Sequence, residues 1–220
     1  MLETYATLQR KVANYLGKTN NATAVTLRDN AINDAINQAC HENRWSWLLT
    51  TTSTALSSGI FGLPADYNPQ MGLETAYIAV AGTDNDHIMG RVSVKDLDSY
   101  STSDYVYWLT YNTSTDRYQF NSNQTSGTVV FYYFRVPTEL SGSQVCAIPD
   151  PQAVVYLAVA KYWLASERDE DNYDRFYQKY LERLDKMKSN DRANNTTRTP
   201  LRNPIDEIDG SRSETLMTQR

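Results

Sequence analysis

Residues 148–184 read IPDPQAVVYLAVAKYWLASERDEDNYDRFYQKYLERL, and this stretch decides the fold of the C-terminal part of the chain. Asp150 can cap free backbone amides and Pro151 suits the first helical position, so a helix is predicted from there to about Ser166. Apolar residues surround the axis of this helix and Lys161 is its one charged residue, a pattern typical of a helix buried among neighbours. We therefore expect it to form core.

The second half of the stretch predicts an amphipathic helix that follows the acidic turn ERDED at 167–171. Apolar and aromatic residues recur here at the i, i+3, i+4, i+7 spacing of one helical face. They are Tyr173, Phe176, Tyr177, Tyr180, Leu181, Leu184 and Met187. This face is expected to pack on the rest of the protein.

Two more helices are predicted at the N-terminus from the same periodicity, over residues 2–16, with Gly17 as a stop signal, and from about 26 to 43. From Trp45 onward the hydrophobic period changes to two and Thr, Ser, Tyr and Val dominate, which indicates strands. The strand candidates are 45–56, 73–81, 88–94, 106–111, 117–122 and 128–136, with a hairpin between 106 and 120. The last candidate is apolar on both faces and should be central or lie at a contact.

These elements predict an α+β protein: a helical bundle of four main helices, two N-terminal and two C-terminal, with an inserted antiparallel β region and an extended C-terminal tail. The predicted domains are 1–45 with 148–189 for the bundle, 46–147 for the β region and 190–220 for the tail. The tail carries only isolated apolar residues, so it cannot nucleate a core of its own. It is either a frayed terminus or a segment that orders on a partner.

Composition narrows the class of protein. A net charge of −5 argues against a protein that grips nucleic acid, because such binding needs clustered Lys and Arg. Since the chain has no run of 18 apolar residues and no basic-then-apolar leader, we expect it to be soluble and made in the cytosol. Cys40 and Cys146 lack metal spacing and are expected to be buried thiols. The 16 Tyr and 4 Trp are of types enriched at protein interfaces.

Catalytic and metal-binding motifs are missing from the sequence. His41 and His87 have no triad spacing, and no phosphate-binding, dinucleotide-binding or zinc-hydrolase signature occurs. The acidic clusters at 167–171 and 206–209 are interpreted as solvated charge. We therefore expect a non-enzyme without catalytic residues, cofactor or metal; an undetected hydrolase stays an alternative, since carboxylates distant in sequence can meet in space.

Three stretches carry a resemblance to a known family: ENRWSWLLTTTSTAL at 42–56, GIFGLPADY at 59–67 and IPDPQAVVYLAVAKYWL at 148–164. Together with the aromatic last helix and the trailing tail, they resemble the head-to-tail adaptor, or connector, proteins of tailed bacteriophages. The most telling parts are Trp45, Trp47 and Leu48, the Leu63–Tyr67 turn, and Pro-Asp-Pro at 149–151. The resemblance covers nearly the whole chain.

The resemblance implies a homo-oligomeric, portal-proximal ring, typically a dodecamer, in the virion neck between capsid and tail. Such a ring joins the portal protein to the tail or nozzle protein and lines the channel for DNA ejection. Double-stranded DNA passes through without specific binding, and twelve copies at −5 would give about −60 in total, which repels it.

The resemblance also implies two sets of contact residues. The last helix would present a second face to a neighbouring subunit, through Tyr173, Tyr177 and Tyr180. The tail would become ordered on the portal or a neighbouring subunit, its ordering cost offset by apolar side chains that fill pockets. Those side chains are Leu201, Ile205, Ile208, Leu216 and Met217.

Two other functions remain open at this point. A tail tubular or nozzle ring component differs from the adaptor in its partner, and crosslinking of residues 190–220 would separate the two. A carbohydrate-binding tail module is suggested by the aromatic strand 106–111, and glycan binding by the isolated protein would favour it.

Overall fold

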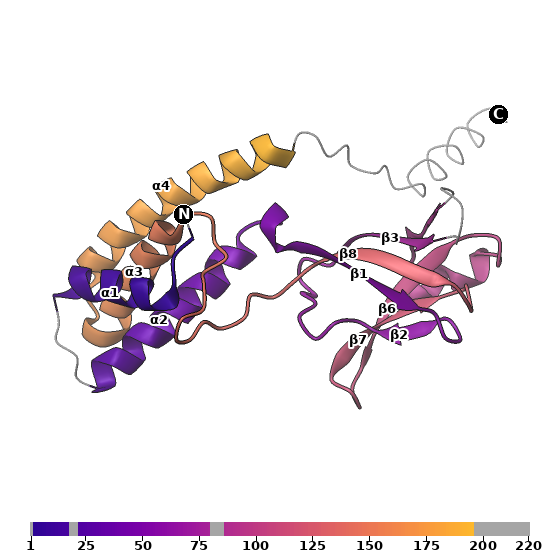
Figure 1. Ribbon diagram of the computed structural model, residues 1–220, viewed down its shortest axis with the longest axis horizontal. Coiled ribbons are helices and arrows are strands. Elements are labelled where there is room, and N and C mark those ends of the chain that lie inside the picture. Colours follow the sequence, from indigo (N-terminus) through magenta and orange to yellow (C-terminus); the bar gives the residue numbers. More distant parts are fainter. Residues whose placement is uncertain (1, 18–21, 80–85, 196–220) are drawn as a thin grey trace, which may run out of the picture. The chain divides into compact units, whose positions relative to one another are not determined.

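The computed structural model of the chain describes residues 2–17, 22–79 and 86–195 (Figure 1). They form two compact units, which we call the helical unit and the β unit. The helical unit holds the described residues up to Leu48 and from Arg135 onward, and the β unit holds Leu49–Phe134. Each unit has its own core.

Helix α3 is the centre of the helical unit. This unit consists of α1 (Tyr5–Leu16), α2 (Ala22–His41), a short 3-10 helix η1 (Ser46–Leu48), α3 (Pro151–Glu167) and α4 (Glu170–Asn195). Helix α3 packs against α1, α2 and α4, and its buried residues lie on all sides of its axis. They are Pro151, Ala153, Val154, Val155, Leu157, Ala158, Val159, Ala160 and Tyr162. The prediction of a fully surrounded helix is confirmed.

Local capping sets the ends of the C-terminal helices. Asp150 accepts a hydrogen bond from the backbone N–H of Gln152 at 3.1 Å, and Pro151 occupies the first turn of α3, as predicted. Arg168 ends α3 in the left-handed conformation, at φ 52°. Asp169 accepts a bond of 2.9 Å from the N–H of Asn172 at the start of α4, and this bond lowers the pKa of the Asp169 carboxyl. The acidic cluster 167–171 therefore makes the turn between the two helices.

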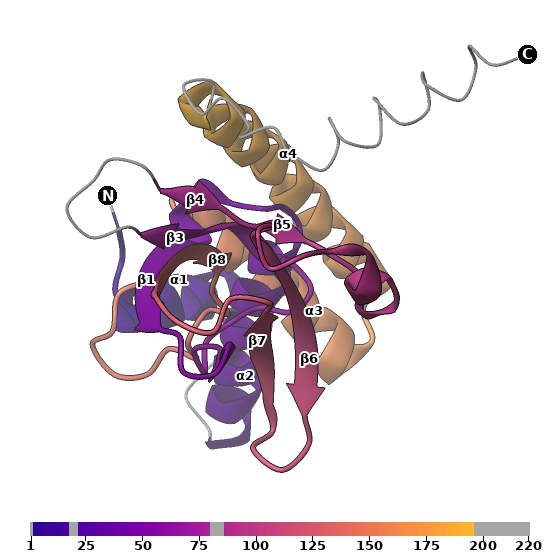
Figure 2. The same cartoon turned by 90° about the vertical axis from the view of Figure 1, so that its right-hand side faces the viewer.

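The β unit contains two four-stranded sheets (Figure 2). The first has the order β1 (Leu49–Ala55), β8 (Thr128–Phe134), β3 (Leu73–Ala79) and β4 (His87–Ile88), and all its pairs are antiparallel. The second has the order β2 (Ile60–Gly62), β7 (Arg117–Ser122), β6 (Val106–Asn112) and β5 (Gly90–Arg91). Strands β6 and β7 form the predicted hairpin, and a 3-10 helix, η2 (Val94–Ser99), follows β5. Strand β8 is central between β1 and β3, as its two apolar faces predicted.

The chain passes between the two sheets four times, and backbone hydrogen bonds continue the pairing at two of these corners, β1 to β2 and β4 to β5. At the first corner, the N–H of Leu56 donates to Gly127 O at 2.8 Å, and Gly59 O accepts from the N–H of Ser122 at 2.8 Å. At the second, the N–H of Met89 donates to Ala76 O at 2.9 Å. Backbone pairing thus continues around the unit and encloses an aromatic core, in which the Phe61 ring stacks on two others. The enclosed residues include Leu56, Phe61, Leu63, Tyr67, Tyr107, Phe120, Val129, Phe131 and Tyr133.

The fold is α+β, but the predicted arrangement, a bundle of four main helices with an inserted antiparallel β region, is wrong. The strands divide into two sheets, and β5 pairs with β6 in parallel. Sequence periodicity identifies strands one at a time and does not show which of them share a sheet. The predicted domain boundaries at 1–45, 46–147, 148–189 and 190–220 stay a prediction, because compactness does not test independent folding.

A buried tryptophan and a buried aspartate fix the segment that follows α2. Trp45 is 0% exposed, its Nε1 donates to Ala39 O at 2.7 Å, and its ring stacks on Trp47 at 5.8 Å. Asp191, near the end of α4, accepts hydrogen bonds from the Oγ of Ser46 at 2.5 Å and from its N–H at 3.2 Å. The end of α2, η1 and the end of α4 are therefore held together.

We expect Trp45→Ala to lower the free energy of unfolding by about 3–5 kcal/mol, because it removes a fully buried ring and leaves a cavity. Trp163→Ala is the matched control, since Trp163 is only partly buried, and its loss should be clearly smaller. Urea unfolding followed by circular dichroism measures both. Equal losses for the two variants would contradict the buried role of Trp45.

Gly59→Ala should destabilise the β unit by at least about 1–2 kcal/mol, because Gly59 has φ +78° and an L side chain is strained there. Its Cβ would also lie 2.7 Å from Ser122 O and 2.9 Å from Gln124 O. Gly62→Ala is the control, since a Cβ at Gly62 meets nothing within 4 Å. Thermal melting of both variants tests whether the β1–β2 corner excludes a side chain at position 59. Equal melting temperatures for the two variants would contradict this.

Candidate interaction surfaces of helix α4

Helix α4 has a buried stripe, a flank on either side of it, and an exposed outer face that includes Asp174, Gln178, Glu182 and Asp185. Its buried stripe consists of Phe176, Tyr180, Leu184, Met187 and Asp191, which face the helical unit. Successive residues of a helix are rotated by about 100°, which places two further rows of side chains beside the buried stripe, one on each side. The two rows differ in the type of side chain they carry. One side, the aromatic flank, holds Tyr173, Tyr177 and Leu181. The other, the cationic flank, holds Arg175, Lys179, Arg183 and Lys186.

The aromatic flank presents stacked rings to solvent. The rings of Tyr173 and Tyr177 lie 5.3 Å apart at 12°, and both side chains are partly exposed. Tyr180, the third residue predicted at a subunit contact, is 0% exposed within its own unit, and its ring lies 5.8 Å from that of Tyr177. Burial raises the pKa of Tyr180, and also that of Tyr173. The accessible part of the predicted contact is therefore Tyr173 and Tyr177, and the contact itself stays a prediction.

The cationic flank lies over aromatic rings. Lys179 Nζ is 5.1 Å from the ring centroid of Phe176 and 5.6 Å from that of Tyr156. Arg175 and Arg183 each place the guanidinium carbon 5.8 Å from a ring, Phe176 and Tyr156 respectively. Such contacts stabilise by about 0.5–1 kcal/mol at exposed sites, and they hold the cations at the helix surface.

Tyr15 of α1 completes this surface. The residue is 43% exposed, and its ring meets those of Tyr156 and Phe176 edge-on, with centroids 5.7 and 5.6 Å away. Arg183 donates to both carboxylate oxygens of Asp150, the nearer at 2.8 Å, and this bond raises the pKa of the guanidinium. We call the whole surface the cation–aromatic face; it consists of Tyr15, Tyr156, Arg175, Phe176, Lys179 and Arg183.

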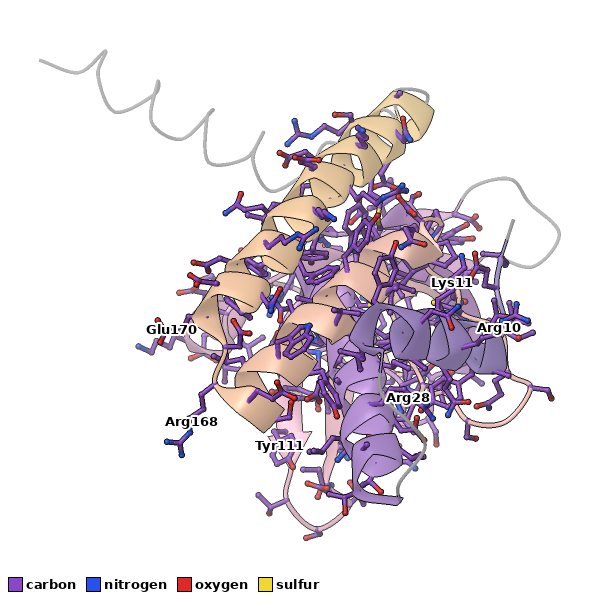
Figure 3. The ribbon with its side chains drawn as sticks, turned by 90° about the vertical axis from the view of Figure 1, so that its left-hand side faces the viewer. Arg10, Lys11, Arg28, Tyr111, Arg168 and Glu170 are labelled. Atoms are coloured by element: carbon purple, nitrogen blue, oxygen red, sulfur yellow. The ribbon has the colours of Figure 1, made fainter. Side chains whose placement is uncertain are left out.

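The sequence missed the cation–aromatic face because it joins α1, α3 and α4. The part of this face that the sequence does indicate is a row of four cations along one side of the helix. It follows from the i, i+4, i+8, i+11 spacing of Arg175, Lys179, Arg183 and Lys186. Figure 3 shows Arg168 and Glu170 projecting from the turn between α3 and α4; both are exposed.

The residues predicted to bind a partner through the tail lie outside the described residues. They are Leu201, Ile205, Ile208, Leu216 and Met217. Their role stays a prediction, and so does the interpretation of the acidic cluster at 206–209.

The histidines and cysteines occupy structural positions. His41 Nδ1 lies 2.7 Å from Asn37 O, one turn back on α2, and the His87 ring stacks on Tyr105 at 4.1 Å. Cys40 and Cys146 are buried free thiols, as predicted, and burial raises the pKa of Cys40 to about 12. Within residues 2–17, 22–79 and 86–195, no three or more His, Cys, Asp or Glu side chains gather as a metal would require.

Comparison with known proteins identifies a family. The family described as SU10 adaptor protein matches residues 3–204, which include both units. No curated protein matches the chain. Among the described helices, none has the length and apolar character needed to cross a membrane. The resemblance to bacteriophage adaptors is confirmed at the level of the family: the chain belongs to the SU10 adaptor protein family.

Proposed function

We propose that this chain is the head-to-tail adaptor of a bacteriophage virion: a closed homo-oligomeric ring of about twelve copies that joins the portal to the tail or nozzle. The observation that carries the proposal is the match of an adaptor family to residues 3–204. The ring would sit in the neck and line the DNA exit channel, as a structural protein without catalysis. A ring below the portal is preferred over a tail tubular or nozzle ring.

The aromatic flank of α4 suits a contact between neighbouring copies. In a ring, each interface is heterologous, so one surface of a copy meets a different surface of the next. Tyr173 and Tyr177 supply large rings with polar edges, the kind of side chain enriched at interfaces, and their stacking already restricts their motion. Little further side-chain entropy would be lost on association.

The tail suits a contact made on assembly. Its apolar residues are separated by polar ones and do not form a continuous hydrophobic stretch. On the portal or on a neighbouring subunit, the apolar side chains of the tail would fill pockets and offset the entropy lost on ordering; they are Leu201, Ile205, Ile208, Leu216 and Met217.

The net charge suits passage of DNA. At −5 per copy, about twelve copies carry about −60, and a ring of this sign repels phosphates instead of holding them. DNA would therefore slide through during ejection without specific binding.

Deletion of residues 196–220 should leave the chain folded but abolish stable docking on the portal. The deletion starts after residue 195 because Asp191 is buried and bonded to Ser46. Circular dichroism and melting test folding, and particle images of the chain mixed with portal test docking. A variant in which residues 196–220 are replaced by a Gly/Ser sequence of equal length is the control, because it keeps the length of the tail but removes its apolar side chains. Unchanged docking by either variant would contradict the tail contact.

Replacing both Tyr173 and Tyr177 by Ser should weaken ring assembly at least about tenfold, because the buried ring area at the interface is lost. Folding should change little, since both rings are partly exposed in the single chain. Gln178→Ser, at an exposed position of the same helix, is the control. Sedimentation of the chain with portal measures assembly, and normal rings from the double variant would exclude the aromatic flank as the interface.

A further inference from the structure

The cation–aromatic face has more positive charge than its own unit neutralises. Among the described residues, Asp150 forms an ion pair with Arg183, whereas Arg175 and Lys179 have no carboxylate within 4 Å. Arg175 is exposed and Lys179 is partly exposed. Beside these cations, Tyr15 leaves 43% of its surface open. A ligand for this face should therefore combine carboxylates with apolar groups.

The chain contains one short segment of this chemistry beyond α4. Residues 205–209 read Ile-Asp-Glu-Ile-Asp, which places three carboxylates and two isoleucines within five positions. Outside this segment, residues 196–220 carry four arginines, Arg198, Arg202, Arg212 and Arg220, against one acidic side chain, Glu214. The negative charge that complements the face is therefore concentrated in residues 205–209.

The length of chain between α4 and this segment limits where it can bind. Nine residues, 196–204, separate Asn195 from Ile205, and fully extended they and the bond to Ile205 span about 33 Å. Pro200 and Pro204 lie in this stretch, and proline and the residue before it favour extended backbone. The linker length therefore permits binding to the same copy or to a neighbour, and the proposed ring favours the neighbour, because every copy then gives one segment and receives one.

We propose that residues 205–209 of one copy bind the cation–aromatic face of the neighbouring copy, an inference that rests on the proposed ring. Asp206, Glu207 and Asp209 pair with Arg175, Lys179 and the accessible side of Arg183. Ile205 and Ile208 cover the open ring of Tyr15. In a closed ring every copy gives one segment and receives one, so all faces are filled. Because the charges lie at the surface, the contact weakens as salt is raised.

Zero-length carbodiimide crosslinking of the full chain assembled on portal tests this directly. It joins an amine to a carboxylate in contact, so Lys179 should be joined to Asp206 or Glu207. Assembly from a mixture of isotopically light and heavy copies should give crosslinks with one light and one heavy partner. The inference would be overturned if the crosslinks joined residues of the same copy only, or if rings formed without these crosslinks. Neither outcome would contradict the proposed ring. Failure to form rings at all would overturn both.

Reciprocal charge reversal gives a second test. Arg175→Glu with Lys179→Glu, and separately Asp206→Lys with Glu207→Lys, should each weaken assembly at low salt at least about tenfold. A chain that carries all four changes should recover most of the loss, because the opposite charges face each other again. Arg10→Glu with Lys95→Glu, both exposed and outside the face, is the matched control and should assemble normally. Lack of recovery by the fourfold variant would contradict direct pairing.

Discussion

Helix α3 has no side that can face water along most of its length, and the helical unit is organised around this constraint. Residues 153–155 and 157–160 are buried without interruption, so α1, α2 and α4 must all cover the helix. Covering α3 uses only one stripe of α4, from Phe176 to Asp191. The two sides of α4 are thereby left available, and both are chemically distinct from an ordinary solvated surface.

The two sides of α4 suit different parts of the proposed assembly. Tyr173 and Tyr177 form a stacked pair that offers area with little loss of entropy. Arg175, Lys179 and Arg183 are held over Phe176 and Tyr156, so their charges have defined positions before any partner binds. A helix anchored by one stripe and exposing two complementary ones suits a subunit that meets neighbours, which agrees with membership of an adaptor family.

The β unit is organised by a different constraint: the backbone N–H and C=O groups at the edges of its sheets need hydrogen-bond partners. Unpaired edges invite association with other strands. Here the chain turns from one sheet into the other at Leu56–Gly59 and at Met89, and the backbone bonds of Leu56, Ser122 and Met89 carry the pairing across both corners. The positive φ of Gly59 and its close approach to Ser122 O explain why a side chain is not accommodated at the first corner.

The sequence by itself determined the local features: the start of α3 at Pro151 with its Asp150 cap, the burial of α3, the stripe of α4 and the β6–β7 hairpin. For β8 it left two alternatives, a central place in a sheet or a place at a contact, and the structure shows the first. Each follows from residues close together in the chain, through periodicity and capping. Only the tertiary structure decided the division into two sheets, the short strands β2, β4 and β5, the parallel pair, and the cation–aromatic face. These depend on contacts between distant residues, such as Tyr15 with Tyr156 and Phe176, and burial of Tyr180 likewise follows from how α4 packs.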